Sequence, residues 1–319
     1  MRTILVAGGA GYIGAHQVRY LLDKGYKVVV FDNHSTGHRE FIDQRSTFIQ
    51  GDLMNLADVR KAFSQPIDAV MLFAGFIQAG ESVQQPLKYY ENNIAGILNM
   101  LRVMHEHDVK KLIFSSSAAV YGEPARVPIT EDLEQKPVNP YGWTKLMVEQ
   151  VLRDCDRAHG LKHVSLRYFN AAGAGYGIGE WHEPESHLIP CILHAAKSGN
   201  AVKTFGNDYP TPDGTCIRDY IHVLDLVKAH HLALEFLFSH NESRIYNLGS
   251  GTGYSVKQVV DMCRQVTGID IPVEVSPRRP GDPARLVASS EKIAKELGWK
   301  PEFGLKDIIS SAWDWHKKR

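Results

Sequence analysis

A glycine-rich turn near the N-terminus constrains the fold of this chain more than any other feature of its sequence. Gly8, Gly11 and Gly14 lie between a β-branched apolar run over residues 3–7 and a segment of helical periodicity over residues 12–24. Glycines at this spacing let the backbone approach a pyrophosphate, and the helix that begins there directs its free N–H groups at the same anion. The glycines alone would indicate only a tight turn. A strand, this turn and a helix in that order predict a dinucleotide-binding unit.

An acidic residue follows this turn where dinucleotide-binding proteins bind a ribose. Asp32 ends the second apolar run, near the offset of about 20 residues expected for a carboxylate that accepts from ribose hydroxyls. A carboxylate there repels a 2′-phosphate, which favours NAD over NADP, although His38 and Arg39 nearby moderate that preference. Asp52, after the third run, is placed to reach the adenine, and a role as a turn residue explains it nearly as well.

Short apolar runs alternate with helical segments over the first half of the chain. The runs cover residues 3–7, 27–32, 46–52, 69–75, 111–117 and 163–170. The helical segments cover residues 12–24, 56–63, 86–107 and 140–159. Strands that alternate with helices at this spacing are joined by right-handed crossovers. The sequence therefore predicts an α/β fold with a doubly wound, Rossmann-type parallel sheet.

The second half of the chain has a different rhythm. From about residue 170, loops rich in glycine, proline and aspartate separate helical segments near residues 188–198, 223–239, 255–267 and 304–316. This pattern predicts a smaller α+β lid that packs closely on the first domain. We expect two domains, residues 1–170 and 171–319, with some later segments returning to the first.

Charge and hydropathy exclude several classes of protein. Lysine plus arginine and aspartate plus glutamate number 36 each, so no net field favours nucleic acid or an anionic membrane. No apolar run reaches the roughly 18 residues of a membrane-spanning helix, and the N-terminus lacks the series typical of a signal peptide. The four cysteines lie far apart, as is typical of unpaired thiols in a reducing compartment. We expect a soluble cytoplasmic protein with a compact, neutral partner, without nucleic acid or membrane partners.

The stretch NPYGWTK places a phenol and an ammonium on one face of a predicted helix. Asn139 is a good N-cap and Pro140 a good first helical residue, so Tyr141 and Lys145 lie one turn apart. Taken alone, the pair suits an ordinary amphipathic helix. However, the preceding strand ends in three serines, and strand ends of this fold bind ligands. We therefore predict a proton-transfer set of Ser117, Tyr141 and Lys145. Lys145 and a cationic nicotinamide would lower the tyrosine pKa from about 10 by roughly three units.

The 15 histidines do not predict a metal site. His230 and His231 are adjacent, and His105 and His107 are two residues apart, so on a helix the members of each pair diverge. No carboxylate or cysteine completes a ligand set with them. We expect no metal.

Five ordered blocks carry a resemblance to a known family. The blocks are GESVQQPLKYYENN (80–93), FSSSAAVYG (114–122), RYFNAAGA (167–174), FGNDYPTPDGTCIRDYIHVLDL (205–226) and RRPGD (278–282). Together with the glycine turn and the Ser117, Tyr141 and Lys145 set, they resemble the extended short-chain dehydrogenase/reductase superfamily and, within it, the UDP-glucose 4-epimerase family. The similarity runs nearly end to end, and the block at 205–226 is its most specific part.

The resemblance implies NAD as a tightly bound cofactor, a UDP-hexose as the substrate, and catalysis by Ser117, Tyr141 and Lys145. Matching positions for cofactor binding are Gly8, Gly11, Tyr12, Ile13, Gly14, Asp32, Asn33, Asp52, Leu53, Phe73, Ala74, Gly75, Asn93, Ser115, Tyr141, Lys145 and Tyr168. Matching positions for substrate binding are Ser117, Asn170, His187, Leu188, Phe205, Arg218, Arg279 and Asp282. Arginine donates to phosphate in a bidentate fork, which suits two arginines clamping a diphosphate. The implied domains are an NAD-binding Rossmann domain and a UDP-sugar-binding domain.

The implied reaction inverts C4 of the sugar through a 4-keto intermediate, with Tyr141 as base and acid. The pocket must hold the nucleotide firmly while the hexose presents either face. The family also pairs two long helices into a homodimer interface, here residues 86–107 and 140–159, although the sequence by itself does not establish a dimer.

Four positions depart from the family pattern, and the first is Leu72, where many relatives have histidine. Gln78 stands where many relatives have lysine, which removes a positive contact near the cofactor. His187 stands where asparagine is frequent, and we expect it near the substrate phosphates or sugar. Leu286 replaces the tyrosine that some relatives have beside the sugar, so N-acetylated UDP-hexoses are an alternative substrate.

Other functions on the same scaffold fit less well. A 4,6-dehydratase carries an acidic pair at the positions of Ala118 and Ala119, and a uronate-specific enzyme needs an extra cation for the carboxylate. A non-catalytic NAD-binding module would also share the fold, since fold does not determine function. Such proteins can lose the tyrosine or the lysine, whereas this chain retains both.

Overall fold

The computed structural model spans residues 1–319 and describes all of them except residues 280–281, which belong to the block at 278–282. The chain divides into two units. Unit 1 comprises Met1–Gly122, Gln135–Arg167 and Val227–Tyr246, and unit 2 comprises Glu123–Glu134, Tyr168–Leu226 and Asn247–Arg319.

A seven-stranded sheet forms the centre of unit 1. Its strands are β1 (Thr3–Ala7), β2 (Lys27–Asp32), β3 (Thr47–Gln50), β4 (Ala69–Leu72), β5 (Lys111–Ser117), β6 (Lys162–Tyr168) and β10 (Arg244–Leu248). Their order is β10-β6-β5-β4-β1-β2-β3, and β1 pairs in parallel with both β2 and β4. This order changes direction beside β1, which is the topological switch point where doubly wound folds bind ligands. The predicted fold class is therefore confirmed.

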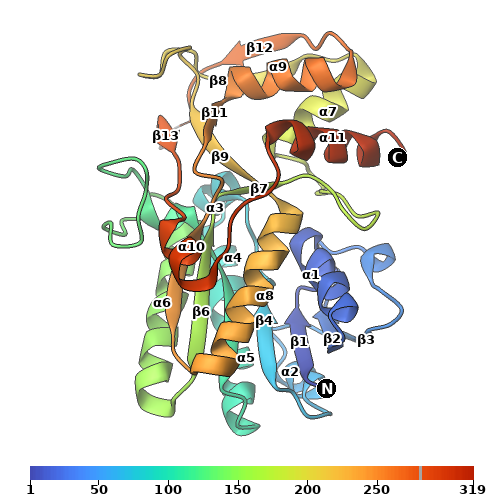
Figure 1. The fold of residues 1–319 in the computed structure, drawn as a ribbon, viewed down its shortest axis with the longest axis vertical. Helices are drawn as coiled ribbons and strands as arrows, with labels where there is room; N and C mark the ends of the chain where they lie inside the picture. The colour runs from blue at the N-terminus through green and yellow to red at the C-terminus, as the bar shows by residue number, and fades with distance from the viewer. Residues whose placement is uncertain (280–281) are drawn as a thin grey trace. The chain divides into compact units, whose positions relative to one another are not determined.

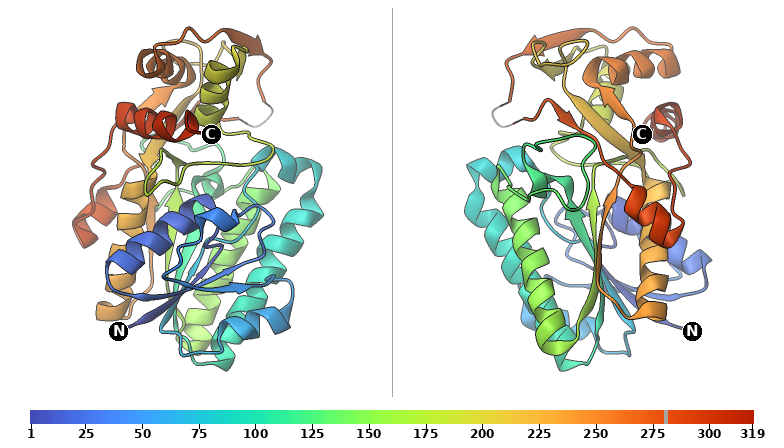
Figure 2. Two further views of the ribbon diagram at one scale, coloured as in Figure 1. Left: turned by 90° about the vertical axis from the view of Figure 1, so that its right-hand side faces the viewer. Right: turned by 60° about the vertical axis from the view of Figure 1, so that its left-hand side comes forward.

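Helices cover both faces of this sheet. They are α1 (Tyr12–Asp23), α2 (Leu56–Ala62), α3 (Ala79–Gln84), α4 (Pro86–Tyr90), α5 (Gly96–Glu106), α6 (Pro140–His159) and most of α8 (Val223–His240). Figure 2 shows α5 and α6 on one face and α1 and α8 on the other. The predicted long helix over 86–107 is interrupted by a π-helical turn at Glu91–Ala95.

Local sequence explains the bounds of α6. The Asn139 side chain accepts a hydrogen bond from Gly142 N at 2.8 Å, and Pro140 occupies the first turn, as predicted. The helix ends at Gly160 in the left-handed conformation, with φ of 70°. Val148 and Leu152 pack its inner face into the apolar core, together with Leu112 and Phe114 of β5.

Unit 2 contains two small sheets and several helices. Strands β7 (Asn170–Ala172), β11 (Gly253–Ser255) and β13 (Arg285–Leu286) all join β9 (Ile217–His222), while β8 (Val202–Phe205) pairs with β12 (Val273–Ser276). The helices are α7 (Leu188–Ser198), α9 (Val256–Thr267), α10 (Glu291–Leu297) and α11 (Leu305–His316). Figure 1 shows α7, α9 and α11 near one another, and their buried faces share one apolar core. The helices predicted over 188–198, 255–267 and 304–316 are confirmed within one residue at each end.

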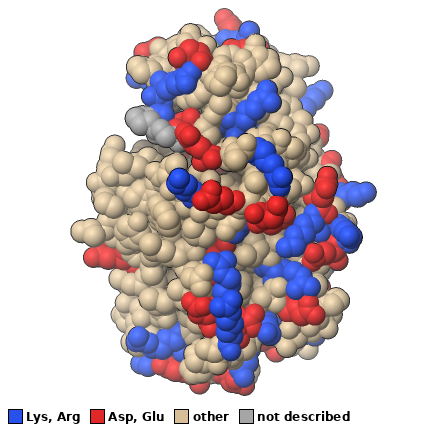
Figure 3. All heavy atoms as spheres, turned by 90° about the vertical axis from the view of Figure 1, so that its left-hand side faces the viewer, with Lys and Arg blue, Asp and Glu red and all other residues tan. Residues whose placement is uncertain are grey.

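The surface agrees with the balanced charge of the sequence. On the face drawn in Figure 3, basic and acidic side chains are interspersed rather than gathered by sign. Within the described part of the chain, no helix is both long enough and apolar enough to span a membrane. All four cysteines lie among the described residues and are free thiols.

Candidate active site

The glycine turn is built so tightly that side chains would not fit in it. Gly8 has φ of +80°, and a Cβ there would lie 2.5 Å from Ala74 N in the loop after β4. A Cβ on Gly14 would lie 2.1 Å from Gly8 O. Real Cβ atoms do not approach so closely, so both positions require glycine. The turn leads directly into α1, whose first residue is Tyr12.

Asp32 is a structural part of this turn rather than a solvated strand end. The side chain is buried, Oδ2 accepts from Ala10 N at 3.0 Å, and Oδ1 accepts from His34 N at 2.8 Å. A carboxylate oxygen can accept more than one hydrogen bond, so the group can also accept from a ribose. Asn33 Nδ2 donates to Asp52 Oδ2 at 2.9 Å, which joins two further predicted cofactor residues.

A buried asparagine connects the glycine turn to helix α6. Asn93 Oδ1 accepts from Phe76 N at 2.8 Å, and its Nδ2 donates to Phe76 O at 2.9 Å, so it holds the loop after β4. The same Nδ2 also lies 3.3 Å from Thr144 Oγ1, which in turn donates to Tyr141 O at 2.7 Å. Phe73, Ala74 and Gly75 of this loop pack against Gly8 and Asn93. The structure thus brings these predicted cofactor residues and Tyr141 into one continuous network.

Lys145 is buried, and its ammonium is fixed. Lys145 is only 3% exposed, and its Nζ donates a hydrogen bond to Ser115 O at 2.8 Å. Burial lowers the pKa of Lys145 to about 8, because the charged form loses its hydration. The ammonium lies 5.8 Å from the centroid of the Tyr141 ring. The lysine ammonium therefore lies beside the Tyr141 ring.

Tyr141 and Ser117 complete the predicted catalytic set. Burial raises the pKa of Tyr141, and a hydrogen bond from Ser117 opposes that rise. Ser117 Oγ accepts from Ala119 N at 3.1 Å at the end of β5. The protein alone therefore leaves the phenol protonated, so the lowering of its pKa that a base requires must come with bound ligands.

A buried ion pair beneath this set was not anticipated from the sequence. Glu149 lies one turn beyond Lys145 and accepts from Arg167 through two bonds, Nε to Oε1 at 2.9 Å and Nη2 to Oε2 at 2.7 Å. Ser116 Oγ donates to Glu149 Oε1 at 2.6 Å, and Arg167 Nη1 donates to Tyr121 OH at 2.7 Å. The spacing of Tyr141, Lys145 and Glu149 was the only available signal, because it places all three on one helix face.

The predicted substrate residues of unit 2 form two neighbouring pairs. Arg218 of β9 is ion-paired with Asp282, and the Arg279 guanidinium lies 3.9 Å from the centroid of the Phe205 ring. Burial raises the pKa of Cys216, while the charges of Arg218 and Arg279 lower it and that of Asp282 raises it, so both pairs act on the same thiol. Of the remaining predicted residues, Tyr168 ends β6, Asn170 begins β7 and Leu188 begins α7.

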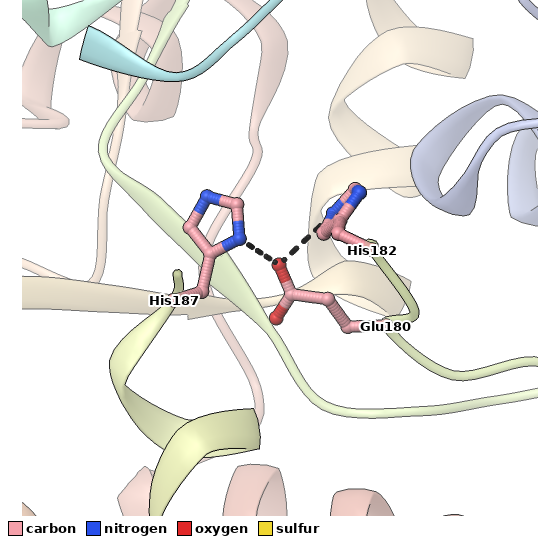
Figure 4. A group of neighbouring side chains, drawn as sticks. All are labelled: Glu180, His182 and His187. Atoms are coloured by element: carbon pink, nitrogen blue, oxygen red, sulfur yellow. Dashed lines mark ion pairs between the residues drawn. The ribbon is translucent and has the colours of Figure 1, made fainter. Parts of the chain in front are cut away.

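His187 lies in a cluster of ionisable groups that Figure 4 shows. His187 Nδ1 is 3.0 Å from Glu180 Oε1 and 3.3 Å from Glu185 Oε1, and His182 Nε2 is 3.5 Å from Glu180 Oε1. Burial lowers the pKa of His187, but the two carboxylates outweigh it and raise that pKa to about 10. The sequence reasoning did not single out Glu180, His182 or Glu185.

Comparisons with known proteins agree with this geometry. Residues 4–249 match the model of the NAD dependent epimerase/dehydratase family. The UDP-glucose 4-epimerase of Halalkalibacterium halodurans is 52% identical over 99% of this chain and 96% of the relative, and that of Lactobacillus helveticus is 50% identical over 98% and 97%. A crystal structure of UDP-glucose 4-epimerase from Bifidobacterium longum in complex with NAD+ and UDP is 41% identical, with a TM-score of 0.94, covering 99% of this chain and 98% of the other. The chain therefore belongs to the NAD dependent epimerase/dehydratase family and, within it, to the UDP-glucose 4-epimerases.

Proposed function

We propose that this protein interconverts UDP-galactose and UDP-glucose through a 4-keto intermediate, with tightly bound NAD. The observation that carries this proposal is the network in unit 1 that joins the glycine turn to Tyr141 through the loop after β4, Asn93 and Thr144. A dinucleotide-binding turn fixed to a phenol, a buried lysine and a serine is the arrangement that alcohol oxidation and ketone reduction both need.

Tyr141 takes the proton from the 4-hydroxyl group in the first half of the reaction and returns it in the second. Lys145 holds a positive charge beside the phenol and favours its ionised form. Ser117 supports proton transfer by hydrogen bonding to the substrate oxygen. Because the same tyrosine oxygen takes the proton and gives it back, this step suits a reaction without net oxidation.

The residues of unit 1 fit NAD. Gly8 and Gly14 allow the turn to fold tightly against itself and against the loop after β4, and α1 begins directly after it, so its first N–H groups would face the pyrophosphate. Asp32, Asn33 and Asp52 are linked at the ends of β2 and β3, where they would hold the adenosine part. NAD, when bound, supplies a reversible hydride acceptor. The remaining predicted cofactor residues are Gly11, Tyr12, Ile13, Leu53, Phe73, Ala74, Gly75, Asn93, Ser115 and Tyr168.

The residues of unit 2 suit a uridine diphosphate. Arg218 and Arg279 would neutralise the two phosphates, Phe205 would pack against uracil, and Asp282 would accept from the ribose. Asn170, His187 and Leu188 are proposed to contact the same ligand. In the structure Asp282 holds Arg218 and the Phe205 ring holds Arg279, so each arginine has a protein partner.

Proton NMR of UDP-galactose, incubated with the purified protein and no added cofactor, tests the function directly. Appearance of the UDP-glucose anomeric signal would establish both the activity and resident NAD. The variant Tyr141→Phe should lose turnover while it still retains NAD, because only the proton acceptor is removed. Absence of conversion even with NAD supplied, or near-normal turnover of Tyr141→Phe, would refute the proposal.

A second substrate class is suggested by one position. Leu286 of β13 lies directly opposite Arg218 of β9 in the sheet register, so it is next to a proposed phosphate ligand. Leucine leaves more room than a tyrosine for a substituent at C2 of the sugar. We therefore propose that UDP-N-acetylglucosamine is also accepted. Turnover of UDP-glucose without any turnover of UDP-N-acetylglucosamine would refute this extension alone.

We also propose a homodimer located in the cytoplasm. Large apolar side chains are exposed on helices that pack together in unit 1, namely Leu87 at 73%, Leu98 at 43%, Trp143 at 40% and Met147 at 41%. An exposed apolar face of this kind is typical of a protein interface. Light scattering after gel filtration should give twice the chain mass, and Trp143→Glu should shift it to the monomer. The four free cysteines favour a reducing compartment.

A further inference from the structure

Two histidines and two glutamates of unit 2 converge near the start of α7. They are Glu180, His182, Glu185 and His187, and all four belong to the segment that precedes this helix. One ligand atom from each of Glu180, His182 and His187 lies within 4.8 Å of the others. Both imidazoles approach the same carboxylate oxygen, Glu180 Oε1, as Figure 4 shows. We propose that this cluster binds a divalent transition metal ion, with zinc as the ion of best fit.

The donor separations are compatible with zinc coordination. Zinc lies about 2.0–2.2 Å from imidazole nitrogen or carboxylate oxygen, so two ligands at a tetrahedral angle are about 3.4 Å apart. The two imidazole nitrogens of His187 and His182 lie 3.0 Å and 3.5 Å from Glu180 Oε1, close to that separation. Among the described residues, His187 Nδ1 has no hydrogen-bond partner despite two nearby carboxylates. Its position is close to the oxygens while its geometry does not satisfy a hydrogen bond.

A second observation points to an additional ligand. The Glu185 side chain is only 8% exposed, and within the described part of the chain its Oε2 atom is buried without a hydrogen-bond partner. Its Oε1 atom already accepts from Ser186 N at 2.8 Å and His187 N at 2.9 Å. An unsatisfied buried carboxylate oxygen is costly, and a metal ion would satisfy it. Glu185 therefore adds a second buried carboxylate beside His187 of the cluster.

Charge leads to the same conclusion. The side chains of Glu180 and Glu185 are 7% and 8% exposed, so two carboxylates are buried close together. A divalent ion placed among these side chains would balance both carboxylate charges. Imidazole together with carboxylate is a donor set typical of zinc. The bound ion would hold the segment at residues 180–187 against the first turn of α7.

Metal binding can be measured without any substrate. The purified full-length chain is treated with a chelator, dialysed and titrated with Zn²⁺ in competition with a chromophoric chelator. One ion per chain is expected. Loss of a direct ligand should weaken binding by more than about 100-fold in His182→Gln and His187→Gln, since changes to outer partners already cost about 10–100-fold. His194→Gln, which changes an exposed histidine on the same helix α7, should bind Zn²⁺ normally.

A measurement on the unmodified chain covers the case in which a variant fails to fold. X-ray absorption of the zinc-loaded protein should show two imidazole ligands and carboxylate oxygens. Hydrogen exchange of peptides over residues 176–190 should slow when Zn²⁺ is added. The proposal would be overturned if Zn²⁺ did not bind stoichiometrically, if the zinc ligands included no imidazole, or if His182→Gln bound Zn²⁺ as tightly as the unmodified chain. Any of these results leaves the epimerase proposal intact, because the readouts do not involve turnover.

Discussion

The buried ion pair between Arg167 and Glu149 provides the sharpest test of how this fold supports its site. The two side chains are 1% and 0% exposed, and they share two hydrogen bonds. Ser116 and Tyr121 form hydrogen bonds with the same pair, and they precede and follow the proposed catalytic Ser117 in the sequence. We consider Arg167→Met, Glu149→Leu and the double variant.

The magnitude follows from what each change leaves behind. Arg167→Met leaves the Glu149 carboxylate buried with only one hydroxyl donor, and Glu149→Leu leaves a buried guanidinium. Removal of one member of a buried pair costs about 3–5 kcal/mol, whereas replacement of both by apolar side chains is far less costly. The double variant also removes the hydrogen bonds that Ser116 and Tyr121 make with the pair, at about 0.5–1.5 kcal/mol each. We therefore expect it to be no less stable than either single variant.

This stability is measured by urea unfolding, with hydrogen exchange of peptides from β5 and β6 as the readout. These peptides report on unit 1. The pair Arg60 and Glu106 is a matched control, because it has two bonds of 2.9 Å but lies on the surface. Arg60→Met should therefore have a much smaller effect than Arg167→Met. If the effects of the two buried substitutions simply add, or if Arg167→Met costs no more than Arg60→Met, the reasoning is wrong.

Three further predictions address the cofactor turn, the response to acid and the diphosphate. Gly14→Ala should purify without NAD, because its Cβ would lie 2.1 Å from a carbonyl oxygen of the turn. The control Gly80→Ala should retain NAD, because nothing lies within 4 Å of its added Cβ. The nucleotide released on denaturation measures both, and NAD retained by Gly14→Ala would contradict the proposed cofactor turn. Burial lowers the pKa of His163 to about 4 and outweighs two nearby carboxylates. Below pH 6.5 the unfolded chain therefore binds a proton at this residue, whereas the folded chain binds it only near pH 4. Stability should therefore fall by roughly 3 kcal/mol between pH 6.5 and 4 from this group, and His163→Gln should flatten that decline in urea midpoints; an unchanged pH profile would count against it. Arg218→Met should raise KM for UDP-galactose roughly 10–100-fold with a smaller change in kcat, as expected for loss of a charged phosphate contact. Arg278→Met, a neighbouring arginine paired with an exposed aspartate, should leave KM unchanged; equal effects of the two arginines would argue against a specific role.

Local sequence was sufficient to predict most of the helices and strands and the fold class. The alternation of apolar runs with helical segments predicted the parallel sheet, since strand and helix periodicity are properties of neighbouring residues. The cap at Asn139 and the glycine after His159 predicted the bounds of α6. The π-helical turn at Glu91–Ala95 was missed, because one inserted residue hardly disturbs a helical pattern.

Other features depend on contacts between residues that are distant along the chain. No periodicity indicates that β10, from residue 244 onward, lies at the edge of the sheet beside β6, or that residues 227–246 belong with unit 1. The pairing of Glu149 with Arg167 is equally invisible, because a buried carboxylate is tolerated only once another strand supplies the guanidinium. The sequence by itself determined which residues form strands, helices and caps. The tertiary structure decided which charged side chains meet, because burial and proximity exist only after the chain has folded.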